Sequence, residues 1–172
     1  MDDRDRLVGI YLRDHLAGSV AALELVERAA RSNETNELGS FLGSLHDEIR
    51  ADQAALLDAM RALAVAPSRV KNGLAWTAEK AGRLKLNGRL LRYSPLSRLY
   101  ELETLEAGIV GKRSLWTSLE ALEDPRLTGV DLARLVERAE AQRAGVEAWR
   151  RRAAAALRPR NTARGISADT TS

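Results

Sequence analysis

The chain contains no cysteine, which excludes disulfide bonds, thiolate nucleophiles and zinc sites built from thiolates. It has only two histidines, too few for a histidine-rich metal site. Aromatic residues make up 4% of the chain, so a core must consist mainly of Leu, Ala and Val. No stretch approaches the roughly 18 uninterrupted apolar residues of a membrane-spanning helix. The N-terminal sequence MDDRDRLVGIYL is charged where a secretory signal would be apolar, so a cytoplasmic protein is expected.

The residues that are abundant favour helices. The chain has 172 residues, of which 45% are hydrophobic, 30% are charged and four are prolines. This length and balance predict one soluble domain with a core of its own. Ala, Leu, Glu and Arg, which dominate the chain, are good helix formers. The composition therefore predicts an all-α fold.

Apolar residues recur every three or four positions in four long segments, which predicts four helices. The expected helices cover residues 3–31, 37–64, 94–122 and 130–157. Short polar turns make each consecutive pair antiparallel, and a crossover of about thirty residues, 66–98, joins the two pairs. We expect this crossover to let the second pair start at the same end of the bundle as the first. The tail at 158–172 is expected to be disordered.

The repeating pattern also assigns faces to the helices. Leu45, Leu56, Leu102 and Leu135 lie on apolar stripes and are predicted to be buried. Four polar residues fall on these faces or near mid-helix, and the antiparallel pairing places them at similar heights: His15, Asp52, Glu106 and Gln142. They predict a polar layer inside the bundle, in which hydrogen bonds would fix the helix register.

The crossover is the most unevenly charged segment. Residues 66–98 contain eight Lys and Arg against the single acid Glu79, whereas the whole chain carries a formal charge of +3. Around Asn87-Gly88 the sequence fits either the end of a helix or a two-residue hairpin over residues 83–93. The helix is favoured because no other strand is expected to pair with a hairpin.

Two antiparallel helix pairs joined by one long crossover resemble the ferritin-like four-helix bundle, over residues 3–157. The segment GRLKLNGRLLRYSPLSRLYELE, residues 82–103, is similar to a stretch in uncharacterised bacterial ferritin-like proteins. The resemblance implies a di-iron site, with a carboxylate from each of two helices and Glu-x-x-His from each of the others. This chain departs from that pattern because the histidines of the pair are missing. His15, Asp52 and Glu106 would be the ligands of a remodelled iron or other divalent metal site.

The basic residues suggest a different function. In the crossover, Arg83, Lys85, Arg89 and Arg92 alternate with leucines, which suits contact with an anionic membrane surface, a nucleic acid or an acidic protein. A solvated cationic face is the alternative. Our main hypothesis is a non-catalytic ferritin-like bundle that binds an anionic partner through this crossover and its arginine-rich end, with no cofactor. The second is a divergent metal-binding or di-iron protein. A homo-oligomer is compatible with both.

Overall fold

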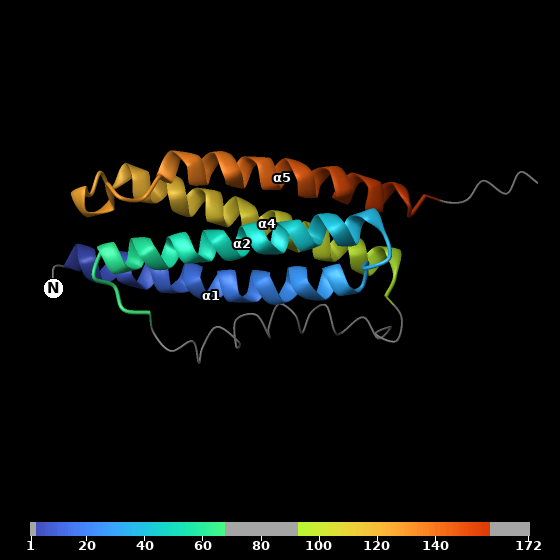
Figure 1. The fold of residues 1–172 in the computed structure, drawn as a ribbon, viewed down its shortest axis with the longest axis horizontal. Helices are drawn as coiled ribbons and strands as arrows, with labels where there is room; N and C mark the ends of the chain where they lie inside the picture. The colour runs from blue at the N-terminus through green and yellow to red at the C-terminus, as the bar shows by residue number, and fades with distance from the viewer. Residues whose placement is uncertain (1–2, 68–92, 159–172) are drawn as a thin grey trace, which may run out of the picture.

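The computed structural model describes residues 3–67 and 93–158, which form a bundle of four long helices with no strand among them (Figure 1). The helices are α1 (Asp3–Arg31), α2 (Glu37–Ala62), α4 (Pro95–Ala121) and α5 (Leu132–Ala155). A short 3-10 helix, η1 (Pro125–Leu127), lies in the turn between α4 and α5. The all-α prediction is confirmed, and the helix ends lie close to those expected. Within these two stretches, no helix combines the length and the apolar character needed to cross a bilayer.

Side-chain caps explain where three of the helices begin. The side chain of Asn36 accepts hydrogen bonds from the backbone N–H groups of Leu38 and Gly39, at 3.0 and 3.4 Å. Ser94 caps α4 and Asp131 caps α5 in the same way. Each cap satisfies an N–H group that has no partner within its helix.

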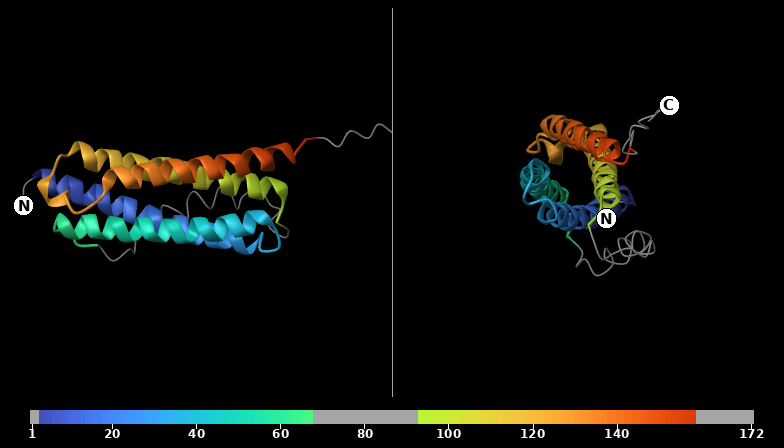
Figure 2. Two further views of the ribbon diagram at one scale, coloured as in Figure 1. Left: turned by 45° about the horizontal axis from the view of Figure 1, so that its top comes forward. Right: turned by 90° about the vertical axis from the view of Figure 1, so that its right-hand side faces the viewer.

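The second helix pair begins at the end of the bundle where α1 finishes. At that end, Nε of Arg28 lies 3.4 Å from a carboxylate oxygen of Glu101, near the start of α4. At the other end, Arg4 donates to the backbone carbonyl of Leu122, just after α4, at 3.3 Å. α1 and α4 are therefore antiparallel neighbours, as Figures 1 and 2 show. The expectation that both pairs start at the same end is wrong, because α4 begins beside the end of α1 and finishes beside its start.

The core is divided into two apolar clusters. The first cluster lies toward the start of α1 and includes Leu12, Leu56, Trp116 and Leu135. The second cluster lies toward the end of α1 and contains Val26, Leu45, Ile49, Leu102, Leu105, Ile109 and Val146. All four leucines predicted to be core residues are buried, with at most 6% of their surface exposed. In α1 the buried stripe falls on Leu12, Leu16 and Val26, which leaves His15 half-buried beside it.

The turn between α1 and α2 is held by a close backbone approach. A Cβ at Gly39 would lie 2.1 Å from the carbonyl oxygen of Asn33. Only glycine lets the first turn of α2 come this near to the loop. Asn33 is 1% exposed, and its side chain donates to the carbonyl of Ala29 at 2.8 Å.

Candidate functional site

The two apolar clusters meet at a buried charge, the carboxylate of Asp52. Asp52 lies on α2 between Ile49 and Leu56, one turn from each, so the helical repeat turns all three inward. It is 2% exposed. Burying an unpaired carboxylate at such a position would destabilise the fold by roughly several kcal/mol. The partners of Asp52 therefore decide what the site can do.

Both oxygens of the Asp52 carboxylate accept hydrogen bonds from other helices. Nε of Arg138, on α5, donates to one oxygen at 2.7 Å. The ammonium of Lys112, on α4, donates to the other oxygen, and it also donates to the amide oxygen of Gln142. The amide nitrogen of Gln142 returns a bond to Asp52 at 3.1 Å. We call these four residues the Asp52 layer. Each of the four side chains in it thus has at least one partner within the layer.

Burial disfavours the charged form of Lys112, whose side chain is 15% exposed. Desolvation therefore lowers the pKa of this ammonium from its ordinary value, and the neighbouring charge of Arg138 adds to the effect. Attraction to Asp52, and more weakly to Glu48, opposes it. The paired carboxylate thus stabilises the ammonium inside the bundle.

A small pocket lies beside the Asp52 layer, between α2 and α5. Its volume is about 140 Å³, and it is lined by Phe41, Ser44, Leu45, Glu48, Ala141 and Gln142. Pockets for organic ligands and cofactors usually measure about 300–1,000 Å³. This pocket can hold a few water molecules next to Gln142, and it is too small for a cofactor.

The structure does not bring the three predicted metal ligands together. His15 lies against Tyr11, edge to face, with ring centroids 4.6 Å apart. Burial lowers the pKa of His15 from its ordinary value and so favours the neutral ring, while the charge of Asp14 opposes this shift. Glu106 lies 3.5 Å from Nε of Arg150. Across residues 3–67 and 93–158, no group of three or more His, Asp or Glu side chains could hold a metal ion.

The donors around Asp52 do not fit the di-iron site that the ferritin-like resemblance implies. Iron is bound by carboxylate oxygens and neutral imidazole nitrogens. Here Lys112 and Arg138 hold both oxygens of Asp52, the buried carboxylate in mid-bundle among the described residues, and cationic donors repel a metal ion. The expected hydrogen-bonded polar layer does exist around Asp52 and Gln142. The expected membership of His15 and Glu106 is wrong, because Lys112 and Arg138 supply the partners instead.

The four cations predicted to bind an anionic partner, Arg83, Lys85, Arg89 and Arg92, lie outside the described residues. So does the choice between helix and hairpin over residues 83–93, of which the structure describes Tyr93 alone. The segment that follows begins at Tyr93, whose hydroxyl accepts a hydrogen bond from the side chain of Asn33 at 2.7 Å. The side-chain oxygen of Asn33 also accepts a bond from Nε of Arg98 at 3.0 Å. Asn33 therefore ties the start of α4 to the α1–α2 turn, a link that no sequence pattern indicated.

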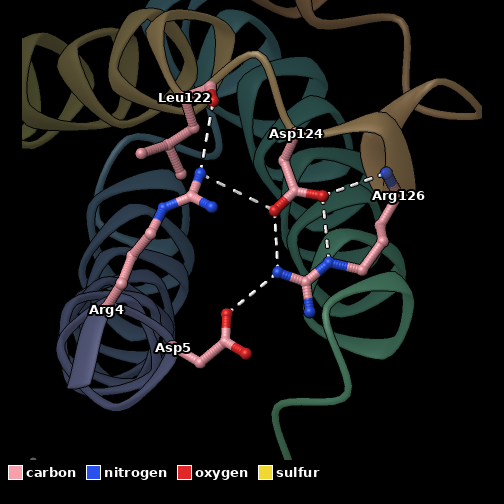
Figure 3. A network of polar contacts seen from close by, with 5 residues as sticks. All are labelled: Arg4, Asp5, Leu122, Asp124 and Arg126. Atoms are coloured by element: carbon pink, nitrogen blue, oxygen red, sulfur yellow. Dashed lines mark hydrogen bonds and ion pairs between the residues drawn. The ribbon is translucent and has the colours of Figure 1, made fainter. Parts of the chain in front are cut away.

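A second polar cluster joins the opposite end of the bundle, where α1 begins and α4 finishes (Figure 3). Arg126 binds the carboxylate of Asp124 through Nε at 2.9 Å and through its terminal nitrogen at 2.7 Å. The same terminal nitrogen reaches Asp5 on α1 at 2.9 Å. These hydrogen bonds hold the pKa of Asp124 at about 2. The cluster connects helix ends and has a structural role.

The sequence matches no protein-family model and no curated protein, and the structure matches no solved structure.

Proposed function

We propose that this chain is a non-catalytic, ferritin-like helical bundle in the cytoplasm. It serves as an interaction module that binds an anionic partner through its basic crossover, residues 66–98.

The order and direction of the helices support the ferritin-like part. Leu63 and Val65 pack in the same cluster as Leu127, at the end of the bundle where α2 finishes. Tyr93 contacts Asn33 at the opposite end. The chain between them must join the two ends, as the long crossover of a ferritin-like bundle does.

The Asp52 layer supports the non-catalytic part. A catalytic carboxylate needs an oxygen that can meet a metal ion, a substrate or a proton donor. Asp52 has neither oxygen available, since Lys112, Arg138 and Gln142 hold them from two helices. Such a satisfied layer is suited to holding α2, α4 and α5 together.

The uneven distribution of charge along the chain is the observation that supports an anionic partner. The described parts of the chain, 3–67 and 93–158, contain eighteen Lys and Arg against twenty-one Asp and Glu. Residues 68–92 contain seven Lys and Arg against one Glu. A bundle of slight negative charge thus carries one strongly basic segment. Basic segments of this kind bind phosphate-bearing surfaces, with an affinity that falls as salt rises.

The test measures binding of the full chain to double-stranded DNA and to vesicles with anionic lipid, at low and at high ionic strength. We expect binding to at least one ligand, weakened by salt. Reversing the charge of Arg83, Lys85, Arg89 and Arg92 to Glu should abolish it. The matched control reverses four exposed cations of the bundle, namely Arg6, Arg61, Arg134 and Arg143, and should keep most of the binding. Absence of binding to both ligands at low salt would reject the interaction module.

A further inference from the structure

One end of the bundle carries most of the exposed apolar side chains. Seven large hydrophobic residues are exposed among those described, and four of them lie where α4 begins and α5 finishes. They are Tyr93 (38% exposed), Leu96 (44%), Tyr100 (41%) and Leu157 (44%). We call these four residues the end patch. The other three, Leu7, Ile10 and Val110, lie elsewhere on α1 and α4.

Ion pairs between α4 and α5 place the members of the end patch at similar heights. Arg150 of α5 lies 3.9 Å from Glu103 and 3.5 Å from Glu106 of α4. Leu157 follows Arg150 by seven residues, about 10 Å further along at helical rise. Because α4 runs in the opposite direction, this brings Leu157 level with the first turns of α4, where Leu96 lies. Figures 1 and 2 show the end of α5 beside the start of α4.

Both helices that meet at this end also carry arginines, Arg98 on α4 and Arg152 at the end of α5, and Arg158 follows α5. The guanidinium of Arg98 lies over the ring of Tyr93, 5.5 Å from its centre. On α5, Arg152 stacks on Trp149 at 4.5 Å, and Arg158 is exposed beside Leu157 in sequence. Stacked arginines keep their charge and can still donate hydrogen bonds to an anion. The basic segment 68–92 joins the bundle at this end, directly before Tyr93.

We propose that the end patch docks on the surface of a bilayer that contains anionic phospholipids. This proposal rests on the proposed function and names the partner. Large apolar and tyrosine side chains next to arginines match the boundary between acyl chains and charged headgroups. A nucleic-acid backbone offers phosphates for the arginines, but it offers no apolar volume for Leu96, Tyr100 and Leu157. The apolar members therefore favour a lipid surface.

The test measures how much of the full chain, and of two triple variants, sediments with vesicles. One set of vesicles is pure phosphatidylcholine, and the other also contains about 30% phosphatidylglycerol, an anionic lipid that attracts basic segments. The patch variant carries Leu96→Ser, Tyr100→Ser and Leu157→Ser. The matched control carries Leu7→Ser, Ile10→Ser and Val110→Ser, at exposed positions away from the patch. Circular dichroism checks that both keep the helical content of the unaltered chain.

We expect the unaltered chain to bind the anionic vesicles and not the neutral ones. The patch variant should bind at least about tenfold more weakly, because three apolar side chains lose their burial in lipid. The control should change by less than about twofold, since exposed side chains away from the lipid lose no burial. Equal binding by the patch variant and the unaltered chain would overturn the end patch while leaving the proposed function standing. Binding to DNA but not to anionic vesicles would also overturn the lipid-docking role of the end patch and leave the proposed function standing. Failure to bind either ligand would overturn both.

Discussion

Lys112 reaches across the centre of the bundle to bond the carboxylate of Asp52. Their helices, α4 and α2, are diagonally opposed, and α1 and α5 lie between them (Figure 2). The ion pair therefore sits at the bundle axis, where the two apolar clusters meet. Through side chains alone, this ion pair links the helix pair α1–α2 to the helix pair α4–α5.

Replacing Asp52 with Ala should destabilise the fold strongly. Lys112 and Arg138 would lose their partner while the ammonium stays mostly buried, which typically costs about 3–5 kcal/mol. Urea unfolding followed by circular dichroism measures this. The double variant Asp52→Leu and Lys112→Met should cost less than the single change, because it removes the buried ammonium as well.

The control for this experiment is an exposed ion pair. Arg31 and Glu27 are bonded at 2.8 Å, with 66% and 55% of their side chains exposed. Replacing Glu27 with Ala should change the free energy of unfolding by about 0.5 kcal/mol or less. A similar loss at Asp52 would show that the Asp52 layer is wet and contributes little.

Two glycines of α2 should respond in opposite directions to alanine. At Gly39 a Cβ would lie 2.1 Å from the Asn33 carbonyl oxygen, so the turn must open. We expect Gly39→Ala to destabilise the protein by about 3 kcal/mol. At Gly43 a Cβ would meet nothing within 4 Å. Gly43→Ala should stabilise the helix by about 0.5–1 kcal/mol. Thermal unfolding compares the two, and equal shifts would contradict the close approach.

Acid should weaken the cluster at the α4–η1 end. Hydrogen bonds from Arg126 hold the pKa of Asp124 at about 2, below its ordinary value of 3.8. Between these values the unfolded chain binds the proton more readily than the folded chain does, so acid favours unfolding. The stabilisation is therefore full above about pH 4 and is lost as the pH falls toward 2.

The variants Asp124→Asn and Arg126→Gln test this cause separately. Each should reduce the dependence of the unfolding free energy on pH over that interval, the first by removing the carboxyl and the second by removing its donor. Urea unfolding at several pH values supplies the data. Unchanged slopes in both variants would mean that other carboxyl groups produce the acid sensitivity.

Protein produced with iron supplied should contain no stoichiometric iron, as measured by elemental analysis. The reason is that Lys112 and Arg138 already neutralise Asp52. Two irons per chain would contradict this. Single Ala variants of His15, Asp52 and Glu106 would then identify which of them are ligands.

The periodic pattern of the sequence was sufficient to predict the helices and most of the core. Leu45, Leu56, Leu102 and Leu135 were assigned correctly because long apolar stripes leave one inward face. Asp52 and Gln142 were recognised as inward because they interrupt those stripes. In α1 the apolar residues do not single out one stripe. The prediction therefore placed His15 on the buried face, where the structure has Leu16.

The partners of Asp52 were not predicted, although a signal exists. Lys112 lies three residues after Ile109 and four before Trp116, which is the inward repeat of its helix. A lysine at such a position is ordinarily expected to extend its charge to solvent. Only the arrangement of α2 and α5 around α4 shows that Lys112 has the carboxylate of Asp52 and the amide of Gln142 as partners. The same holds for Asn33, because its side-chain partners Tyr93 and Arg98 lie sixty or more residues away.

The Asp52 layer separates the core into two halves that share no apolar boundary. Leu56 and Trp116 belong to one half, and Leu45 and Leu102 belong to the other. Cavities made in different halves are separated by a polar plane, so their effects on folding free energy should add. Amide hydrogen exchange should accordingly divide the bundle crosswise, with each helix contributing one segment to each of two protection groups. The units that open together would then be the halves of the bundle, each made of parts of all four helices.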